Sequence, residues 1–302
     1  MKKLVSVLLT AVLLVSLVLA IPASADELPQ SIGLTGVTNA RQLGGYVGAD
    51  GRTVKDGALI RTAKLADATD EDLDKLANVY HVSKVIDFRT LVEATSAADP
   101  TIAGASNTRM SAIDVGTSAF EIVKLVGEAS SGTAAIDLDT IKSLVSLAQN
   151  GVIGTIMKDQ YEGLVSDVGS IVVYRQFFNM LLSANGETVL YHCTSGKDRA
   201  GVATILLLSA LGVDKETIKQ DFLLSNQYYA DQMQEAYDKA YSVCPIASVA
   251  TDVSRAYGVD EAWLNAVYST IQSKYGSMDI YLKLCMGLSN SDLQQLRDAY
   301  LN

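Results

Sequence analysis

Histidine and cysteine are scarce in this sequence: its 302 residues include two His and three Cys, and no two cysteines lie close together. Zinc centres are typically built from closely spaced Cys and His ligands, so the sequence supports no such centre and we expect no metal or other cofactor. An odd number of thiols leaves at least one outside any intramolecular disulfide. Cys244 and Cys285 are expected either to pair with each other or to remain buried free thiols.

Positive charge is also in short supply. The chain has 24 Lys and Arg against 34 Asp and Glu, a formal net charge of −10. Such a surface repels nucleic acid and anionic membranes at long range. Proline is rare, with four residues, and 49% of the residues are hydrophobic, which is enough to bury a core without disulfide bonds. The composition predicts a globular protein that has no nucleic acid partner.

Long apolar runs are confined to the N-terminal region. Lys2 and Lys3 precede an uncharged apolar run over residues 4–21, and small residues follow up to Ala25. This order is typical of a secretory signal peptide cleaved after Ala25. A retained membrane anchor is the alternative, because the run is about as long as the shortest membrane-spanning helices. We expect residues 1–25 to be removed and the protein to be secreted without stable insertion in a membrane.

Residues 26–302 show no repeat of fixed period and suit one α/β domain. Apolar, β-branched segments predict buried strands near residues 58–61, 82–88 and 188–192. Residues 111–185 are expected to form a helical, lid-like insertion, because they carry several helical patterns with Gly- and Ser-containing joints. These patterns lie near residues 118–127, 137–149 and 170–183.

Several helix ends are marked by capping residues. Thr69 or Asp67 precedes a helical pattern whose first turn is acidic, which is a favourable helix start. Gly212 follows the apolar helix that begins after residue 198, in the position where glycine commonly ends a helix. Ser289 or Ser291 is expected to cap the last helix.

The most unusual segment is TVLYHCTSGKDRAGVATILLLSALG, residues 188–212, in which four reactive or charged residues lie between a strand and a buried helix. A loop that enters a helix leaves backbone N–H groups unpaired, so its partial charge is positive. Adding Lys197 and Arg199 there is unfavourable unless an anion occupies the loop, where Arg199 can hold two oxygens. A dianionic phosphoryl group fits. The same dipoles would stabilise a thiolate at Cys193, which would then be a nucleophile aimed at phosphorus.

A nucleotide-binding glycine-rich loop is excluded at this position. That motif requires a glycine five residues before Gly196 and a Ser or Thr after Lys197. The sequence has Tyr191 and Asp198 at those positions.

The motif HCTSGKDRAG resembles the signature loop of cysteine-dependent phosphatases, in which five residues separate Cys and Arg. Its Gly-Lys-Asp-Arg centre is similar to that of the bacterial tyrosine phosphatase family that includes secreted mycobacterial and Listeria enzymes. The segments TNARQLGGY, ALIRTAKL and VIDFRTLVE resemble further boxes of that family. The resemblance implies a central, mainly parallel sheet flanked by helices.

The resemblance also implies the chemistry. Cys193 would attack phosphorus to give a cysteinyl-phosphate, and Arg199 would hold the equatorial oxygens until water releases inorganic phosphate. The cradle would be completed by backbone amides, those of Thr194, Ser195, Gly196 and Lys197. The leaving oxygen needs a proton, and Asp198 is the first candidate for the acid. Asp87 and Asp114 are rivals, although Asp87 fits better as a loop organiser that pairs with an arginine.

By the same resemblance, several further residues are expected to support the site or to bind substrate. Lys197 would contact an additional phosphate, which would widen the substrate range toward phosphoinositides. His192 would orient the loop and stabilise the thiolate, and Asn39 and Arg41 would support the site. Ala200 stands where the family usually has Ser or Thr, so breakdown of the intermediate lacks a hydroxyl that Thr194 or Ser195 would have to replace. Three further charged residues would brace the scaffold: Arg61, Arg89 and Glu93.

Three functions remain open at this point. Phosphotyrosine is the leading substrate, and phosphoinositide or inositol phosphate hydrolysis is the alternative within the same chemistry. The third is a phosphate-ligand binding protein that turns over poorly, which the substitution at Ala200 would favour.

The absence of metal ligands generates a first prediction. Chelators are expected to leave phosphatase activity intact, whereas thiol oxidants are expected to abolish it, because the nucleophile is a thiolate. The measurement is phosphate release by the purified protein before and after EDTA or hydrogen peroxide. Activity that disappears in EDTA would contradict the metal-free reaction.

Overall fold

The chain forms one five-stranded sheet, seen in a computed structural model that describes residues 30–112 and 136–302. The strands are Arg41–Gln42 (β1), Leu59–Thr62 (β2), Val82–Asp87 (β3), Ser106–Arg109 (β4) and Thr188–His192 (β5). Their order is β1-β2-β5-β3-β4, with β1 antiparallel to β2 and all other neighbours parallel. The predicted α/β fold with a mainly parallel sheet is confirmed, and the predicted core strands are β2, β3 and β5.

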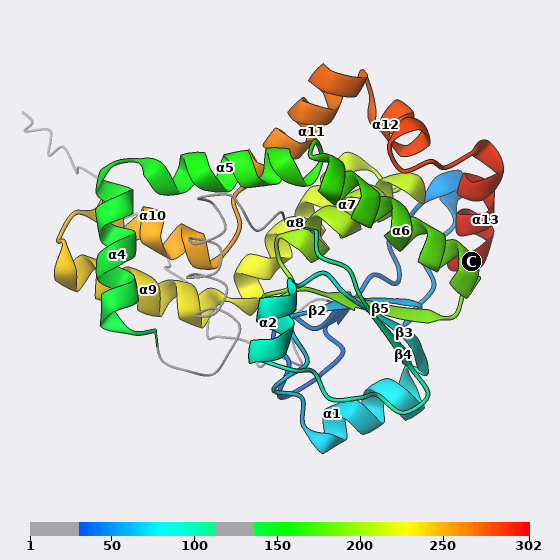
Figure 1. Cartoon of the computed structure of the whole chain (residues 1–302), viewed down its shortest axis with the longest axis horizontal. Helices are drawn as coiled ribbons and strands as arrows, with labels where there is room; N and C mark the ends of the chain where they lie inside the picture. The colour runs from blue at the N-terminus through cyan, green and yellow to red at the C-terminus, as the bar shows by residue number, and fades with distance from the viewer. Residues whose placement is uncertain (1–29, 113–135) are drawn as a thin grey trace, which may run out of the picture.

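Helices make up most of the remainder (Figure 1). They are Asp70–Asp74 (α1), Leu91–Ser96 (α2), Leu138–Gln149 (α4), Val152–Leu164 (α5), Val168–Ala184 (α6), Arg199–Ala210 (α7), Lys215–Tyr228 (α8), Ala230–Val243 (α9), Ala247–Tyr257 (α10), Glu261–Tyr275 (α11), Met278–Leu284 (α12) and Asn290–Tyr300 (α13). The expected caps hold: Thr69 accepts from the Asp72 amide at α1, and Ser289 accepts from the Asp292 amide at α13. Gly212 follows α7 with φ +82°, a conformation that glycine adopts without strain.

The central strand β5 has both faces buried. Because side chains alternate along a strand, Val189 and Tyr191 join the larger hydrophobic core, where Tyr191 packs edge-on against Phe177 of α6 at 5.2 Å between ring centroids. Leu190 points the other way, into a smaller core that includes Leu76. In Figure 1, α6 and α7 cover one face of the sheet and α1 lies on the other. The sheet therefore holds the end of β5 in a rigid layer.

The region expected to be a helical insertion contains α4 and α6, which match two of the three predicted helical patterns, and α5, which was not predicted. The third pattern, residues 118–127, lies outside the described residues, as does the predicted signal peptide. In Figure 1, α4 and α5 gather with α9 and α10 at one end of the molecule. Within the described residues, no helix combines the length and apolarity needed to cross a membrane.

Candidate active site

The unusual segment forms a buried loop at the carboxyl end of the central strand. β5 ends at His192, the loop runs over residues 193–198, and α7 begins at Arg199. Cys193 starts the loop and is 1% exposed. The carboxyl ends of parallel strands are the usual place for ligand sites in α/β proteins, so the predicted loop lies where the fold favours a binding site.

Side chains behind the loop bind its carbonyl oxygens. Asn39 Nδ2 and the Tyr229 hydroxyl donate to the Ser195 carbonyl at 3.1 and 2.7 Å. Arg61 Nη2 donates to the Gly196 carbonyl at 2.6 Å. In a trans peptide the C=O and N–H of one plane point in opposite directions. The amide that follows each of these carbonyls is therefore directed away from the supporting side chains.

The loop amides that point away from these supporting side chains have hydrogen-bonding capacity to spare. Among the described residues, the backbone N–H groups of Gly196, Lys197 and Asp198 donate to no recorded acceptor. Successive amides that converge in a turn form an anion-binding concavity. Gly196 is needed for this shape: its φ is +64°, and a Cβ there would lie 2.3 Å from the Thr62 carbonyl oxygen. This geometry is compatible with an anion in the loop, and phosphate binding there stays a prediction.

A buried ion cluster fixes the supporting arginine. Asp221 Oδ1 lies 3.1 Å from Arg41 Nε, and its Oδ2 lies 2.9 Å from Arg61 Nη1. Burial alone would raise the pKa of Asp221, but the charges of the two arginines hold that pKa below its ordinary value. Arg41 also donates to the side-chain oxygen of Asn39. Asn39 thus supports the loop by binding the Ser195 carbonyl, and Arg41 supports it indirectly by binding Asn39 and Asp221.

Arg199 is held by a carboxylate from α2. Its Nη1 and Nη2 donate to the two oxygens of Glu93 at 2.8 and 2.7 Å. Burial would raise the pKa of Glu93, but the charge of Arg199 and hydrogen bonds from Arg199, Thr194 and the Thr90 amide hold that pKa well below its usual range. The Nε atom of Arg199 is buried and has no hydrogen-bond partner among the described residues. It leaves one donor of the guanidinium available for an anion.

Asp198 occupies the N-cap position of α7 without serving as a cap. Its side chain makes no capping hydrogen bond, and it is 6% exposed. Oδ1 accepts a hydrogen bond from the Tyr161 hydroxyl of α5 at 2.7 Å. No ion pair of Asp198 is recorded within the described part of the chain. A structural salt bridge, the ordinary explanation for a buried Asp, therefore does not account for it.

Comparison with known proteins agrees with this geometry. Residues 32–302 match the family profile described as "Tyrosine phosphatase family". The chain belongs to the tyrosine phosphatase family. It is a protein-tyrosine phosphatase, which is a phosphoric monoester hydrolase. The predicted family is confirmed.

Relatives of this tyrosine phosphatase share much of its length. It is 31% identical over 267 residues to H16_A0669 of Cupriavidus necator, a candidate tyrosine-protein phosphatase, with 88% of this chain and 86% of the other covered. It is 29% identical over 243 residues to the tyrosine-protein phosphatase of Nostoc commune, covering 80% and 73%. It is also 29% identical over 153 residues to the triple specificity protein phosphatase PtpB of Mycobacterium tuberculosis, covering 48% and 54%.

Lys197 of the phosphatase is bound to a helix end. Its Nζ donates to the carbonyls of Ala256 and Gly258, at the end of α10, at 2.7 and 2.9 Å, and the residue is 1% exposed. Burial lowers the pKa of Lys197. Contact with a second phosphate stays a prediction, and the two carbonyls occupy two of the three donors of the ammonium group.

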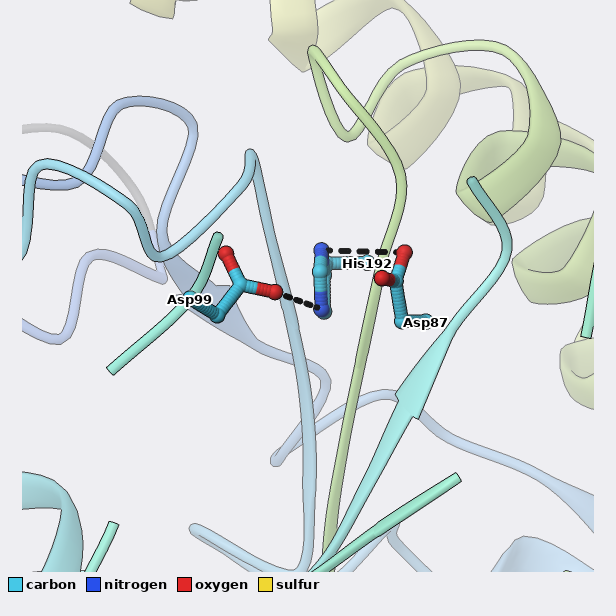
Figure 2. Close-up of side chains that lie close together, drawn as sticks. All are labelled: Asp87, Asp99 and His192. Carbon is cyan, nitrogen blue, oxygen red and sulfur yellow. Dashed lines mark ion pairs between the residues drawn. The ribbon is translucent and has the colours of Figure 1, made fainter. Parts of the chain in front are cut away.

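His192 lies between two carboxylates beneath the loop. Figure 2 shows its Nδ1 facing Asp87 at 3.8 Å and its Nε2 facing Asp99 at 3.3 Å. Nδ1 also lies 3.2 Å from the Cys193 carbonyl oxygen, which makes His192 a neighbour of the loop backbone. Arg89 donates to both carboxylates, with Nη2 at 3.0 Å from Asp87. Asp87 therefore pairs with an arginine, as expected for a loop organiser.

Asp87, Asp99 and His192 each offer one ligand atom for a metal ion, and these atoms lie within 4.8 Å of one another. The guanidinium of Arg89 already lies against the two carboxylates. A fixed positive charge between the acidic groups opposes binding of a cation. The donor set therefore fits an arginine ion pair better than a metal centre.

The remaining cysteines, Cys244 and Cys285, are buried free thiols.

Several site residues were missed or undervalued in the sequence. Glu93 was expected to brace the scaffold, yet it binds Arg199 and accepts from the Thr194 hydroxyl at 2.6 Å. Tyr161 and Tyr229 carried no local signal, because tyrosine at helical spacing usually marks a packing face. Asp114, the third candidate acid, lies outside the described residues.

Replacement of Glu93 by Gln tests the role of this carboxylate. Loss of its charge leaves Arg199 less firmly held, so kcat/KM should fall by on the order of 100-fold, as expected for a misplaced catalytic group. Unfolding free energy should fall by about 1–3 kcal/mol at neutral pH, the usual effect of removing a buried charged hydrogen-bond partner. Both are measured against the surface variant Glu187→Gln, whose side chain is 60% exposed.

The pH dependence of that stability loss is a further part of the test. Because folding lowers the pKa of Glu93, its contribution is present above the unfolded pKa and is lost as pH falls. The stability difference between wild type and Glu93→Gln should therefore shrink as the solution is acidified below about pH 4, near the ordinary pKa of glutamate. A difference that stays constant from pH 7 to pH 3 would contradict the charge pairing.

Proposed function

We propose that this tyrosine phosphatase is a secreted enzyme that works without a metal ion, in two steps, through a cysteinyl-phosphate at Cys193. The observation that carries the proposal is the loop itself. Its carbonyls are bound from outside by Asn39, Arg61 and Tyr229, so its amides converge on the side away from them. A thiol at the start of such an amide cradle is placed to attack the phosphorus atom that the cradle holds.

In the first step the Cys193 thiolate forms a bond to phosphorus while the bond from phosphorus to the ester oxygen breaks. Developing charge on the phosphoryl oxygens is stabilised by the loop amides and by Arg199, preorganised donors that need no rearrangement during the reaction. The ester oxygen leaves with the bonding electron pair and takes a proton from Asp198. The products are the phosphorylated cysteine and the free alcohol or phenol.

In the second step water attacks the phosphorus of the cysteinyl-phosphate. Asp198, now ionised, accepts a proton from that water, and the bond between phosphorus and sulfur breaks to return the thiolate and inorganic phosphate. Ala200 is fully buried and supplies no hydroxyl here. The Thr194 hydroxyl donates to Glu93 at 2.6 Å, so it is not available to compensate. Ser195 is then the remaining candidate for this hydroxyl, and breakdown of the intermediate is the step we expect to be slow.

Phosphotyrosine is the substrate we favour. The engagement of Lys197 with two backbone carbonyls supports this preference, because it occupies two of the three ammonium donors that a second phosphate could use. The name of the Mycobacterium tuberculosis relative, a triple specificity phosphatase, supports a wider range. Phosphoinositide or inositol phosphate hydrolysis is the second candidate. The proposal of export is supported by the signal-like residues 1–25.

Phosphate release by residues 26–302 tests the chemistry directly. Wild type should release phosphate from a phosphotyrosine peptide faster than from phosphoserine, a phosphoinositide or phytate. Cys193→Ser should lose at least about 1,000-fold in rate because the nucleophile is removed. Release that persists in Cys193→Ser would contradict the cysteinyl-phosphate. Binding of phosphate esters without release would favour the binding-protein alternative.

Asp198→Asn tests the proton donor. Phenol is a poor leaving group that needs protonation, so kcat/KM for phenyl phosphate, which reports the first step, should fall by on the order of 100-fold or more. The leaving group of the activated ester p-nitrophenyl phosphate departs without much help, so kcat/KM for that substrate should fall by only about 3-fold. Equal slowing of the two substrates would remove Asp198 from this role.

A further inference from the structure

Within the described residues, the side-chain carboxylate of Asp198 accepts its hydrogen bond from the Tyr161 hydroxyl. This hydroxyl donates to Oδ1 at 2.7 Å, across 37 positions of sequence, and both residues are buried. Burial, reinforced by the neighbouring charge of Asp198, raises the pKa of Tyr161 well above its ordinary value. The tyrosine therefore keeps its proton and acts as a donor rather than as a base.

This contact distinguishes the two oxygens of the carboxyl group. When Asp198 is protonated, a proton on Oδ1 would turn toward the tyrosine oxygen and leave the tyrosine hydrogen without a recorded acceptor. A proton on Oδ2 keeps the hydrogen bond from Tyr161 to Oδ1 intact. Since unmade buried hydrogen bonds cost free energy, the acidic proton is favoured on Oδ2.

The ring of Tyr161 is itself firmly held. It stacks on Trp263 of α11, with 5.7 Å between ring centroids and 27° between planes. It also meets Phe222 of α8 edge-on at 5.8 Å. Tyr161 has 0% exposure. Two aromatic neighbours therefore restrict the ring, and the ring sets the position of the hydroxyl that donates to Asp198.

We propose that Tyr161 is a positioning residue for the proton transfer, one that fixes the Asp198 carboxyl with Oδ2 carrying the proton toward the leaving oxygen. This inference rests on the proposed role of Asp198. It gives α5, a helix of the expected insertion, an indirect part in the chemistry of the loop. Tyr161 would act only through the orientation of the acid.

The test is Tyr161→Phe, which removes one oxygen and keeps the ring. With phenyl phosphate, kcat/KM, which reports the step in which the leaving group departs, is expected to fall on the order of 10-fold, the size of one charge-assisted hydrogen bond in the transition state. With p-nitrophenyl phosphate, kcat/KM should change by less than about 2-fold, because that leaving group depends little on the acid. A merely structural role would slow both substrates alike, and that result would overturn the proposal.

A double-variant cycle supplies a second readout. Asp198→Asn leaves no acid to orient. Adding Tyr161→Phe to that variant should therefore not lower kcat/KM for phenyl phosphate any further. A full additional 10-fold loss in that background would show that Tyr161 acts independently and would overturn the proposal, since coupled residues are non-additive. The matched control is Tyr281→Phe, which deletes a buried hydroxyl that has no hydrogen-bond partner among residues 30–112 and 136–302 and should match wild type with both substrates.

Two further measurements separate the possible failures. Trp263→Phe retains the Tyr161 hydroxyl but removes part of the aromatic contact that supports its ring. This variant should show the same leaving-group dependence as Tyr161→Phe, with a smaller loss of activity. If neither Tyr161→Phe nor Trp263→Phe shows a leaving-group dependence, the proposal is contradicted. If Asp198→Asn has no leaving-group dependence, the inference fails while Cys193-dependent phosphate release still stands. If that release is itself missing, the proposed function fails instead.

Discussion

The site depends on hydrogen bonds that hold the carbonyl oxygens of the loop from outside. Without the donors of Asn39, Arg61 and Tyr229, the peptide planes of the loop could rotate and its amides would lose their common direction. These donors come from segments far apart in the chain, brought together by the sheet and by α8. Anion binding by backbone amides is strong only when their orientation is already fixed. The sheet and the surrounding helices hold these donors in the positions that keep the loop amides oriented.

Buried charge is the second organising feature, and each arginine near the loop has an acidic partner. Arg199 pairs with Glu93, Arg89 with Asp87, and Arg61 with Asp221. Buried ion pairs contribute little net stability because desolvation offsets their attraction. They do, however, fix the guanidinium groups in one orientation. A phosphate dianion then meets donors that are already in place, and the two step chemistry we propose needs such preorganisation.

The helices beyond the sheet also reach the loop. α5 contributes Tyr161 to Asp198, and the end of α10 accepts hydrogen bonds from Lys197. Two consecutive loop side chains are thus held by helices from different parts of the chain. A movement of this helical region would change the environment of the acid and of the lysine together. This arrangement connects the helical region directly to side chains of the loop.

Local sequence determined much of this protein. Alternating or continuous apolar residues specified β2, β3 and β5, capping residues specified the starts of α1 and α13, and the spacing of Cys193 and Arg199 specified the loop and its family. These features depend on neighbours within a few residues, and local steric and hydrogen-bonding rules act at that range.

Other features became visible only in the tertiary structure. The pairing of Glu93 with Arg199 and of Tyr161 with Asp198 joins residues 106 and 37 positions apart. Glu93 ends the segment VIDFRTLVE, which resembles a family box, but nothing in that segment identifies Arg199 as its partner, and nothing near Tyr161 distinguishes it from other tyrosines on helices. The same holds for Lys197, whose partners are backbone carbonyls that carry no sequence signal. Contacts of this kind are decided by how the sheet and helices pack, so the sequence alone determined the reactive groups and the fold determined how they are held.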